Sequence, residues 1–287
     1  MNQRSLTIIL TIAVPSIVVF ALGFQRHPAP ETHWVAPDGE ADQDAGGKVY
    51  FDVAMFNIRR GKNSEGVRNL DGTASVLKGC DIAFLNEVSG GMWGAPDQSE
   101  RLGDKLGLDS YFLTSQRRYF QDYFGNAVLT RFPIREWQSM NLKKTNGQGH
   151  RHIVTMKSNW NGRIVTLILT HLDGDADRAR QLDRALTVFR TTPAPAILAG
   201  DFNTTRSDPA LAAALEGGVI DALGIGLGEN DPLRRKDWIL VKGFSVQSAE
   251  VIEEFVSDHP CFRATLAFSD RMSKATLTSG TDTLPTP

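Results

Sequence analysis

The sequence predicts an α/β fold in which two mixed β-sheets pack together with helices on the outside. Strand-like runs, about nine in all, outnumber the helical patterns, of which there are about four. Strands and helices therefore do not alternate as they would in a chain of βαβ units, and two sheets are needed to bury so many apolar strands. The chain has 287 residues, which suits one large domain or two small ones.

The strand-like runs are short, rich in β-branched and aromatic residues, and bounded by polar or turn-forming residues. The clearest of them lie at 49–58, 81–85, 125–130, 153–156, 164–170, 196–199, 238–241 and 262–268. Helical patterns fall between some of these strands, at 69–78, 97–106, 175–190 and 207–215. In the helix at 175–190 apolar residues recur at helical spacing, and we expect Asp175 to cap its N-terminus.

The composition is that of an ordinary globular protein, with 41% hydrophobic and 22% charged residues. The formal net charge of −2 argues against a protein that coats DNA or RNA with a large basic surface, although a small basic cleft is compatible with it. The two cysteines, Cys80 and Cys261, are too few for a disulfide framework or a four-thiolate zinc site. We expect both to remain unpaired.

The N-terminal residues 1–26 are typical of a signal peptide or a membrane anchor. Residues 6–24 contain no charged side chain and follow Arg4. Such a run can cross a bilayer core of about 30 Å as a helix, and small residues near its end would also serve as a cleavage site. The early positive charges favour export of the rest of the chain, either anchored by residues 6–24 or secreted, or periplasmic, after cleavage.

Three further segments follow this leader. Residues 27–47 are rich in Pro, Gly, Ala and acidic residues without an apolar period, and they predict a flexible linker. Residues 48–268 carry the strand and helix patterns and predict one compact working domain. Residues 269–287 are rich in Ser and Thr and end in Pro-Thr-Pro, which is typical of a disordered tail.

Polar residues stand at the ends of the apolar strands, where the strands themselves do not need them. They are Asn57, Glu87, His171, Asp201, Asn203, Asp237, Asp258 and His259. If the strands belong to two facing sheets, these side chains can converge at one rim. Carboxylate and amide oxygens are hard ligands suited to Mg²⁺ or Mn²⁺, and the scarcity of cysteine argues against thiol chemistry. Each residue alone is typical of an ordinary loop, whereas their combination indicates a site.

In this order along the chain, the residues resemble the motifs of the endonuclease/exonuclease/phosphatase superfamily, which includes pancreatic-type deoxyribonucleases and neutral sphingomyelinases. The matching segments are Phe56-Asn57-Ile58, Leu85-Asn86-Glu87, Gly125-Asn126, Thr170-His171, Asp201-Phe202-Asn203, Asp237-Trp238 and Ser257-Asp258-His259. The resemblance spans about residues 49–266, and so the whole domain at 48–268. It implies a four-layer α/β sandwich and a metal-dependent phosphoric ester hydrolase.

The resemblance also implies roles for the polar residues. Glu87 would be the principal ligand of Mg²⁺ or Mn²⁺, with Asn57 and Asp258 also at the metal. Asn126 would lie near the bound phosphate of the substrate. Separately from the resemblance, Arg59 lies in a basic segment after the first motif, and we expect it to bind a phosphate-rich substrate.

The implied catalytic group comprises His171, Asp201, Asn203, Asp237 and His259. Asp201 would align or deprotonate the attacking water, and Asn203 would hold that water and the phosphate oxygens. His259, paired with Asp237, would contact the scissile phosphate, and His171 would bind the phosphate from the opposite side.

The motifs leave the substrate open. The first hypothesis is an exported Mg²⁺-dependent phosphodiester hydrolase that acts as an endo- or exonuclease. The second is a membrane-facing phospholipid or sphingolipid phosphodiesterase, for which a membrane tether would be natural. The third is a non-catalytic binding module, against which the retained buried acids argue. The expected partner is thus a phosphoester substrate, nucleic acid or lipid headgroup, and no obligate protein partner is expected.

Overall fold

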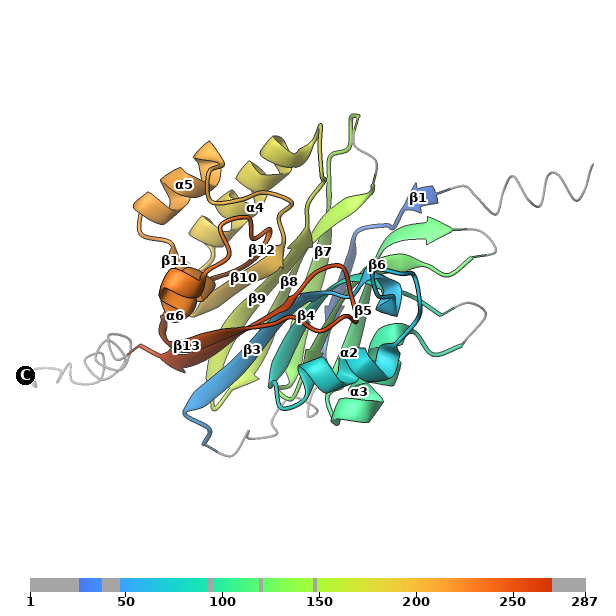
Figure 1. The fold of residues 1–287 in the computed structure, drawn as a ribbon, viewed down its shortest axis with the longest axis horizontal. Coiled ribbons are helices and arrows are strands. Elements are labelled where there is room, and N and C mark those ends of the chain that lie inside the picture. Colours follow the sequence, from blue (N-terminus) through green and yellow to red (C-terminus); the bar gives the residue numbers. More distant parts are fainter. Residues whose placement is uncertain (1–25, 38–46, 92–94, 119–120, 147–148, 270–287) are drawn as a thin grey trace, which may run out of the picture.

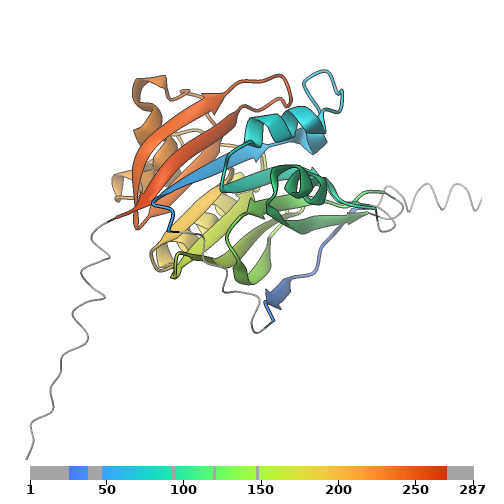
Figure 2. The same cartoon turned by 90° about the horizontal axis from the view of Figure 1, so that it is seen from below.

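The computed structural model of the protein describes residues 26–37, 47–91, 95–118, 121–146 and 149–269. Within these residues two seven-stranded β-sheets pack face to face, and helices cover their outer faces (Figures 1 and 2). The predicted α/β fold is confirmed, and its arrangement is that of a four-layer sandwich.

Both sheets are mixed, and each has a parallel pair of strands in its middle. In spatial order, sheet A contains β1 (Arg26–Pro28), β5 (Asp109–Arg118), β6 (Phe124–Thr130), β4 (Ile82–Ser89), β3 (Tyr50–Asn57), β14 (Cys261–Phe268) and β13 (Phe244–Ile252). Sheet B contains β11 (Ile220–Asp221), β12 (Asp237–Lys242), β10 (Ala196–Asp201), β9 (Arg163–His171), β8 (Arg151–Trp160), β7 (Ile134–Leu142) and β2 (Thr32–Val35). The parallel pairs are β3 with β4 and β9 with β10, which end at the same rim of the sandwich.

The main apolar core fills the space between the two sheets. At its centre the ring of Trp160 lies 4.8 Å from those of both Phe51 and Phe132, and all three side chains are fully buried. Each buried side chain of this kind stabilises the fold by roughly 1.5–3 kcal/mol. Trp160 ends β8 opposite the first residue of β9, at the end of sheet B far from His171. The aromatic core therefore holds one end of the sandwich and leaves the other end to polar residues.

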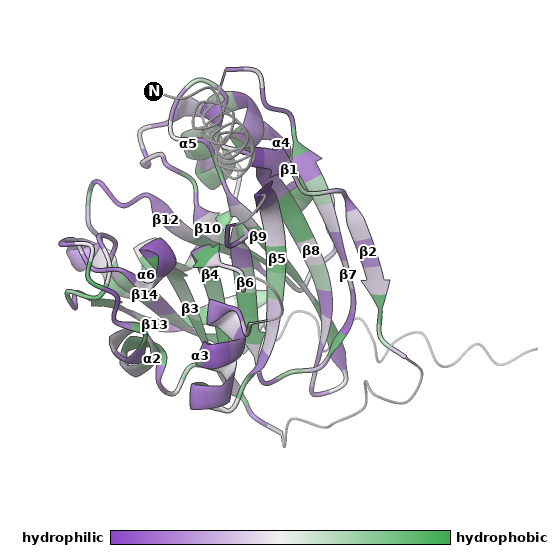
Figure 3. Ribbon diagram, turned by 90° about the vertical axis from the view of Figure 1, so that its right-hand side faces the viewer, coloured by the Kyte–Doolittle hydropathy of each residue, from purple (hydrophilic) through white to green (hydrophobic). Residues whose placement is uncertain are grey.

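The helices bury their apolar residues against the outer faces of the sheets, and hydrophilic residues make up much of their ribbons (Figure 3). Sheet A is covered by α2 (Leu70–Leu77) and α3 (Gln98–Leu106), and sheet B by α4 (Arg178–Thr191) and α5 (Pro209–Glu216). The short elements are α6 (Ala222–Leu227) and the 3₁₀ turns η1 (Arg59–Gly61) and η2 (Gly228–Asn230). Cys80 and Cys261 are free and buried in the apolar layer under α2 and α3.

The four predicted helices are present, and their starts follow from capping side chains. Asn69, Asp97 and Asp208 each accept a hydrogen bond from a backbone N–H in the first turn of α2, α3 and α5. The prediction of Asp175 as the cap of α4 is wrong, because that helix begins at Arg178 after Asp177. The carboxylate of Asp177 turns instead toward the backbone N–H of Thr145, at 2.8 Å.

The predicted flexible linker at 27–47 is wrong for its first part. Residues Arg26–Pro28 form β1, which pairs with β5 at one edge of sheet A. Residues Thr32–Val35 form β2, which pairs with β7 at one edge of sheet B. The composition of this segment hid both strands, because an edge strand needs only one hydrogen-bonded side and few buried side chains. The two sheets therefore include described residues that precede position 48, the predicted start of the working domain.

Several predictions fall outside the described residues. They concern the leader up to residue 25, the segment 38–46 and the tail from residue 270. No helix in the described part of the chain is long and apolar enough to span a membrane.

The edge strand β2 contributes one packed aromatic residue, so the contribution of this strand to stability can be tested by mutation. Trp34 packs against the inter-sheet core, with its ring centroid 6.3 Å from that of Tyr111. We expect Trp34→Ala to lower the free energy of unfolding by about 1–2 kcal/mol in urea denaturation. Val35→Ala, at a neighbouring side chain that is 58% exposed, should change it by less than about 0.5 kcal/mol. Equal urea midpoints for Trp34→Ala and the wild type would contradict this placement of β2.

Candidate active site

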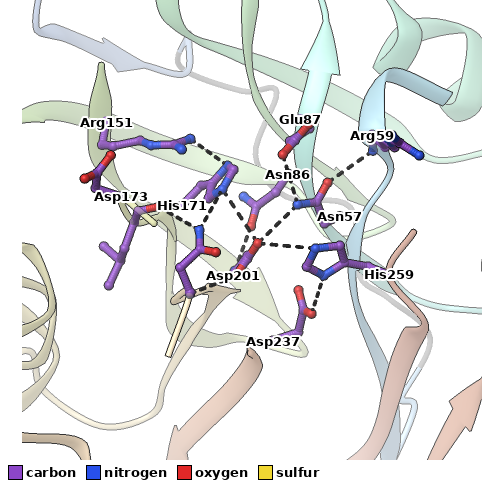
Figure 4. A network of polar contacts seen from close by, with 12 residues as sticks. Asn57, Arg59, Asn86, Glu87, Arg151, His171, Asp173, Asp201, Asp237 and His259 are labelled. Atoms are coloured by element: carbon purple, nitrogen blue, oxygen red, sulfur yellow. Dashed lines mark hydrogen bonds and ion pairs between the residues drawn. The ribbon is translucent and has the colours of Figure 1, made fainter. Parts of the chain in front are cut away.

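Polar side chains from both sheets meet at the rim where the two parallel strand pairs end (Figure 4). Asn57 ends β3 and Glu87 lies near the end of β4, both in sheet A. In sheet B, Asp201 ends β10 and is the register partner of His171 on β9 and of Asp237 on β12. The structure thus brings these predicted residues together from strands that are far apart in the sequence.

A β-bulge in β4 directs Glu87 toward this rim. The register between β4 and β6 shifts between Leu85 and Val88, which leaves Asn86 and Glu87 outside the regular pairing. Glu87 has a φ of 57°, which a residue other than glycine rarely adopts. Asn203, with a φ of 51°, shares this conformation on the opposite side of the rim. Backbone strain of this kind is typical of functional sites.

Gly200 allows the strands behind the site to approach closely. A Cβ atom at this position would lie 2.0 Å from the carbonyl oxygen of Thr170 on β9. Any other residue would therefore push β10 away from β9 and separate Asp201 from His171.

The buried carboxylate of Asp201 is the centre of the site. Its Oδ1 accepts a hydrogen bond from the backbone N–H of Asn203 at 2.8 Å, and its Oδ2 accepts one from Asn57 Nδ2 at 3.2 Å. The Nε2 atoms of His171 and His259 lie 3.6 and 3.7 Å from the same Oδ2. Burial and the neighbouring charge of Asp237 raise the pKa of Asp201 to about 6, although its hydrogen bonds and His259 lower it.

His259 and Asp237 form a hydrogen-bonded pair beside Asp201. Nδ1 of His259 lies 2.7 Å from Oδ2 of Asp237. Burial lowers the pKa of His259, but the hydrogen bond to Asp237 and the charges of Asp237, Asp201 and Asp258 outweigh burial and raise the pKa to about 9. The imidazole is therefore held protonated at neutral pH, with its Nε2–H directed toward the centre of the site.

His171 is held in the opposite, neutral state by an arginine that the sequence analysis missed. Arg151, the first residue of β8, donates from its guanidinium to Nδ1 of His171 at 2.9 Å. Because a guanidinium can only donate, Nδ1 of His171 accepts, and the proton of the ring lies on Nε2, the nitrogen near Asp201. Nδ2 of Asn203, which is 3.4 Å from this Nε2, donates instead to the carbonyl oxygen of Leu172 at 3.0 Å. Burial, then Arg151 and His259, lower the pKa of His171 well below its usual value. Apart from the polar pair Arg151-His152 before an apolar run, no sequence signal marks this role.

Asn86 was also missed, although it links the two sheets directly behind the site. Its Oδ1 accepts a hydrogen bond from the backbone N–H of Asp201 at 2.7 Å, and its Nδ2 donates to the carbonyl oxygen of Thr170 at 3.2 Å. The same Nδ2 donates to Oδ1 of Asn126 at 2.9 Å. Two consecutive polar residues, Asn86 and Glu87, inside an apolar strand were the available signal for a bulge.

Asn126, predicted to bind substrate, lies in this supporting layer. Its side-chain amide is engaged on both sides, by Asn86 and by Nε2 of His152 at 2.8 Å. The side chain of Asn126 is 3% exposed. Its contacts are those of a residue that positions Asn86.

Arg59 and Asp258, predicted for substrate and metal, pair with each other at the mouth of the site. Arg59 Nε lies 3.3 Å from Asp258 Oδ2, and both side chains are half-exposed. The backbone N–H of Arg59 donates to Oδ1 of Asn57 at 3.1 Å. Ser257 donates from its hydroxyl to the carbonyl oxygen of Asn57 at 2.7 Å, which ties the loop before β14 to the end of β3.

The site has the donor atoms that a divalent cation requires. The carboxylates of Glu87 and Asp201 both accept from Asn57 Nδ2, at 3.3 and 3.2 Å, so their oxygens face the same space. Asp237 Oδ1 is buried without a hydrogen-bond partner in the structure. Asp201, Asp237 and His259 also have ligand atoms within 4.8 Å of one another. A protonated His259 cannot bind a metal, however, so the carboxylate oxygens fit a hard cation better.

This fold and this site define a metal-dependent phosphoric ester hydrolase. The chain belongs to the endonuclease/exonuclease/phosphatase family, whose sequence model matches residues 55–259. The resemblance recognised in the sequence is thereby confirmed, and the hypothesis of a non-catalytic binding module is not supported.

Several solved structures share this fold. An endonuclease/exonuclease/phosphatase from Beutenbergia cavernae is 21% identical, with a TM-score of 0.61 over 77% of this chain and 72% of that chain. A mannosyl-6-phosphatase from Bacteroides thetaiotaomicron is 18% identical, with a TM-score of 0.59 over 76% and 100%. D. rerio TDP2, solved with a single-stranded DNA product, is 19% identical, with a TM-score of 0.57 over 76% and 98%. No curated protein sequence matches the chain.

The contacts of Asn86 predict a large effect of its removal. We expect Asn86→Ala to lower the free energy of unfolding by about 2–4 kcal/mol, because it leaves the buried N–H of Asp201 and the carbonyl of Thr170 without their partner. Urea denaturation measures this loss. Asn146→Ala, at an exposed loop position, should unfold like the wild type. An unchanged urea midpoint for Asn86→Ala would contradict a linking role for this amide.

The pair formed by His259 and Asp237 predicts a pH effect. In the wild type, stabilisation by protonated His259 is fully present below pH 6.5 and is lost as the pH rises through about 9. Asp237→Asn should lower the pKa of His259 clearly below 9, because it removes the largest of the interactions that raise it, as measured by NMR titration of the imidazole protons without metal. His152, whose pKa burial lowers to about 4, provides an internal control and should not move. A pKa of His259 that stays near 9 in the variant would show that Asp237 does not hold the proton.

Proposed function

We propose that the protein is an exported Mg²⁺-dependent nuclease that hydrolyses the phosphodiester bonds of DNA or RNA. The observation that carries this proposal is the opposed protonation of two neighbouring groups. His259 holds a proton, with its pKa raised to about 9, and its Nε2 lies 3.7 Å from Asp201, a buried carboxylate with a pKa of about 6. Adjacent groups with such separated pKa values are suited to act as acid and base in one reaction.

The residues then divide the reaction between them. Asp201 accepts the proton of the attacking water, and the side-chain amide of Asn203 orients that water. His259 donates a hydrogen bond to a phosphate oxygen, where negative charge develops as the water attacks. Asp237 keeps His259 protonated and correctly oriented through the 2.7 Å hydrogen bond. Neutral His171 contributes its Nε2–H on the other side of Asp201.

Glu87, beside Asn57, would hold the divalent cation, for which we propose Mg²⁺ because the available ligands are hard oxygens. A bound cation neutralises the charge of the phosphate and of the leaving oxygen. Asp258 would reach the cation only by leaving Arg59, or through water, because its carboxylate is paired in the structure.

Basic residues at the mouth of the site support nucleic acid as the substrate. Arg59 and Arg60 follow Asn57 after one residue, Ile58, and lie in η1, where both have a positive φ. Such arginines are suited to bind the repeated phosphates of a nucleic-acid backbone. Export is proposed from the charge-free run at residues 6–24 behind Arg4.

A phospholipid or sphingolipid headgroup is the second candidate, and exposed apolar residues favour it. Phe255 is 87% exposed three residues before Asp258, and Leu233 is 95% exposed four residues before Asp237. Apolar side chains on loops next to a catalytic rim are suited to enter a lipid surface.

Nicking of supercoiled plasmid by the full-length protein, purified in mild detergent, tests the proposed nuclease. We expect nicking in Mg²⁺ that EDTA abolishes, because the acidic site needs its cation. Asp201→Asn should lower the rate about 10²- to 10⁴-fold, and His259→Ala should lower it to a similar extent, since each removes one proton-handling group. Asp183→Asn, an exposed carboxamide substitution on α4, should leave the rate unchanged.

The same preparation should be offered vesicles of sphingomyelin and of phosphatidylinositol. Headgroup release without plasmid nicking, by a protein that unfolds cooperatively, would overturn the nuclease in favour of the lipid phosphodiesterase.

A further inference from the structure

Two arginines lie over one phenylalanine beside the site, and a third arginine is paired with one of them across two strands. The guanidinium carbons of Arg60 in η1 and Arg118 in β5 lie 4.9 and 5.2 Å from the ring centroid of Phe124. Arg26 on β1 is the register partner of Arg118, directly opposite it in the antiparallel pair. We call Arg26, Arg60 and Arg118 the arginine cluster.

This arrangement is unfavourable without a bound anion. Like charges directly opposite each other destabilise an antiparallel pair. Arg118 is only 8% exposed, and its Nε has no hydrogen-bond partner, although such a buried donor normally has one. No ion pair joins the arginine cluster to a carboxylate within the described residues. The nearby acids act only at longer range, Asp122 on Arg60 and Arg118 and Glu87 on Arg60.

The electrostatics of the arginine cluster agree with its geometry. Burial, then Arg60 and Arg26, lower the pKa of Arg118 to about 10, so the like charges are close enough to repel. Burial also lowers the pKa of Arg60, while Glu87 raises it. The arginine cluster is thus adjacent to the side of the active site that carries Glu87.

We infer that the arginine cluster binds a second phosphate group of the substrate, next to the phosphate that is cleaved. This inference rests on the proposed nuclease, and it identifies the substrate as a strand with several consecutive phosphodiesters. A guanidinium presents its N–H groups in a fork that matches two phosphate oxygens. Phe124 keeps two of these forks in place before the substrate arrives, which reduces the entropy lost on binding.

Binding at the arginine cluster should not depend on base sequence. The ring of Phe124 is only 7% exposed and is covered by the guanidinium groups, so it does not offer a face for a stacked base. Contacts to phosphate carry no sequence information. The arginine cluster thus sets the length of strand that the enzyme prefers.

The test uses full-length protein and thymidine oligonucleotides with one to five phosphodiesters and no terminal phosphate. We expect kcat/KM of the wild type to rise about tenfold or more at the length that first reaches the arginine cluster. Arg118→Gln and Arg60→Gln should each remove this step, mainly by raising KM. Arg163→Gln is the matched control, because Arg163 also lies over a phenylalanine, 4.7 Å from the ring centroid of Phe268, but on the first residue of β9. It should retain the step.

A second measurement separates binding from folding. Thermal unfolding without phosphate should occur at the same temperature in Arg118→Gln as in the wild type, or higher, since the variant removes a like-charge contact. Added inorganic phosphate should raise the unfolding temperature of the wild type more than that of either variant. An equal response to phosphate together with an unchanged length step in both variants would overturn the inference.

Failure of the proposed nuclease would look different. The wild type would then cleave no oligonucleotide of any length. If inorganic phosphate still stabilised the wild type more than Arg118→Gln, the arginine cluster would stand as an anion site for another phosphorylated substrate. If it stabilised both equally, the inference would fall as well.

Discussion

One buried amide, that of Asn86, holds the two sheets together at the rim where the chemistry is placed. Its oxygen and its nitrogen bind the backbone of β10 and of β9, so sheet A determines where Asp201 lies in sheet B. Such a link is strong because both partners are buried and would otherwise be unpaired. At the far end of the sandwich the two sheets contact each other through apolar side chains, and such packing has no preferred direction. At this rim they contact each other through hydrogen bonds, which have a defined geometry. These hydrogen bonds hold Asp201 in place, and they also fix the backbone next to His171 and Glu87.

The second constraint is electrostatic. Asp201 and Asp237 are register partners on adjacent strands, so two carboxylates share a small, buried volume. The fold balances them with one protonated imidazole and with hydrogen bonds from Asn57 and Asn203, and Arg151 keeps His171 neutral. Glu87 adds a third carboxylate, so the three carboxylates outnumber the two cations, His259 and Arg151, which favours binding of a divalent cation. The acid, the base and the cation site therefore all depend on the close pairing of β10 with β12.

Much of this arrangement could be predicted from the sequence, and the failures have physical reasons. Polar residues at the ends of apolar strands marked Asn57, His171 and Asp201, because a buried strand has no other use for them. The edge strands β1 and β2 could not be predicted, since edge pairing is a long-range interaction that leaves little trace in local composition. Asn86 and Arg151 were missed because their importance lies in what they touch across the sheets. Asn126 was predicted to bind the substrate, and in the structure its amide contacts Asn86 and His152.

The left-handed backbone at Glu87 has a consequence for how this chain can change over generations. At a φ of 57° stability alone would favour glycine, and a β-carbon there lowers the stability of the folded state. A lineage released from selection for catalysis should therefore drift toward glycine or asparagine at position 87 and gain stability as it does so. The carboxylate at this position therefore lowers the stability of the fold in exchange for its place at the site.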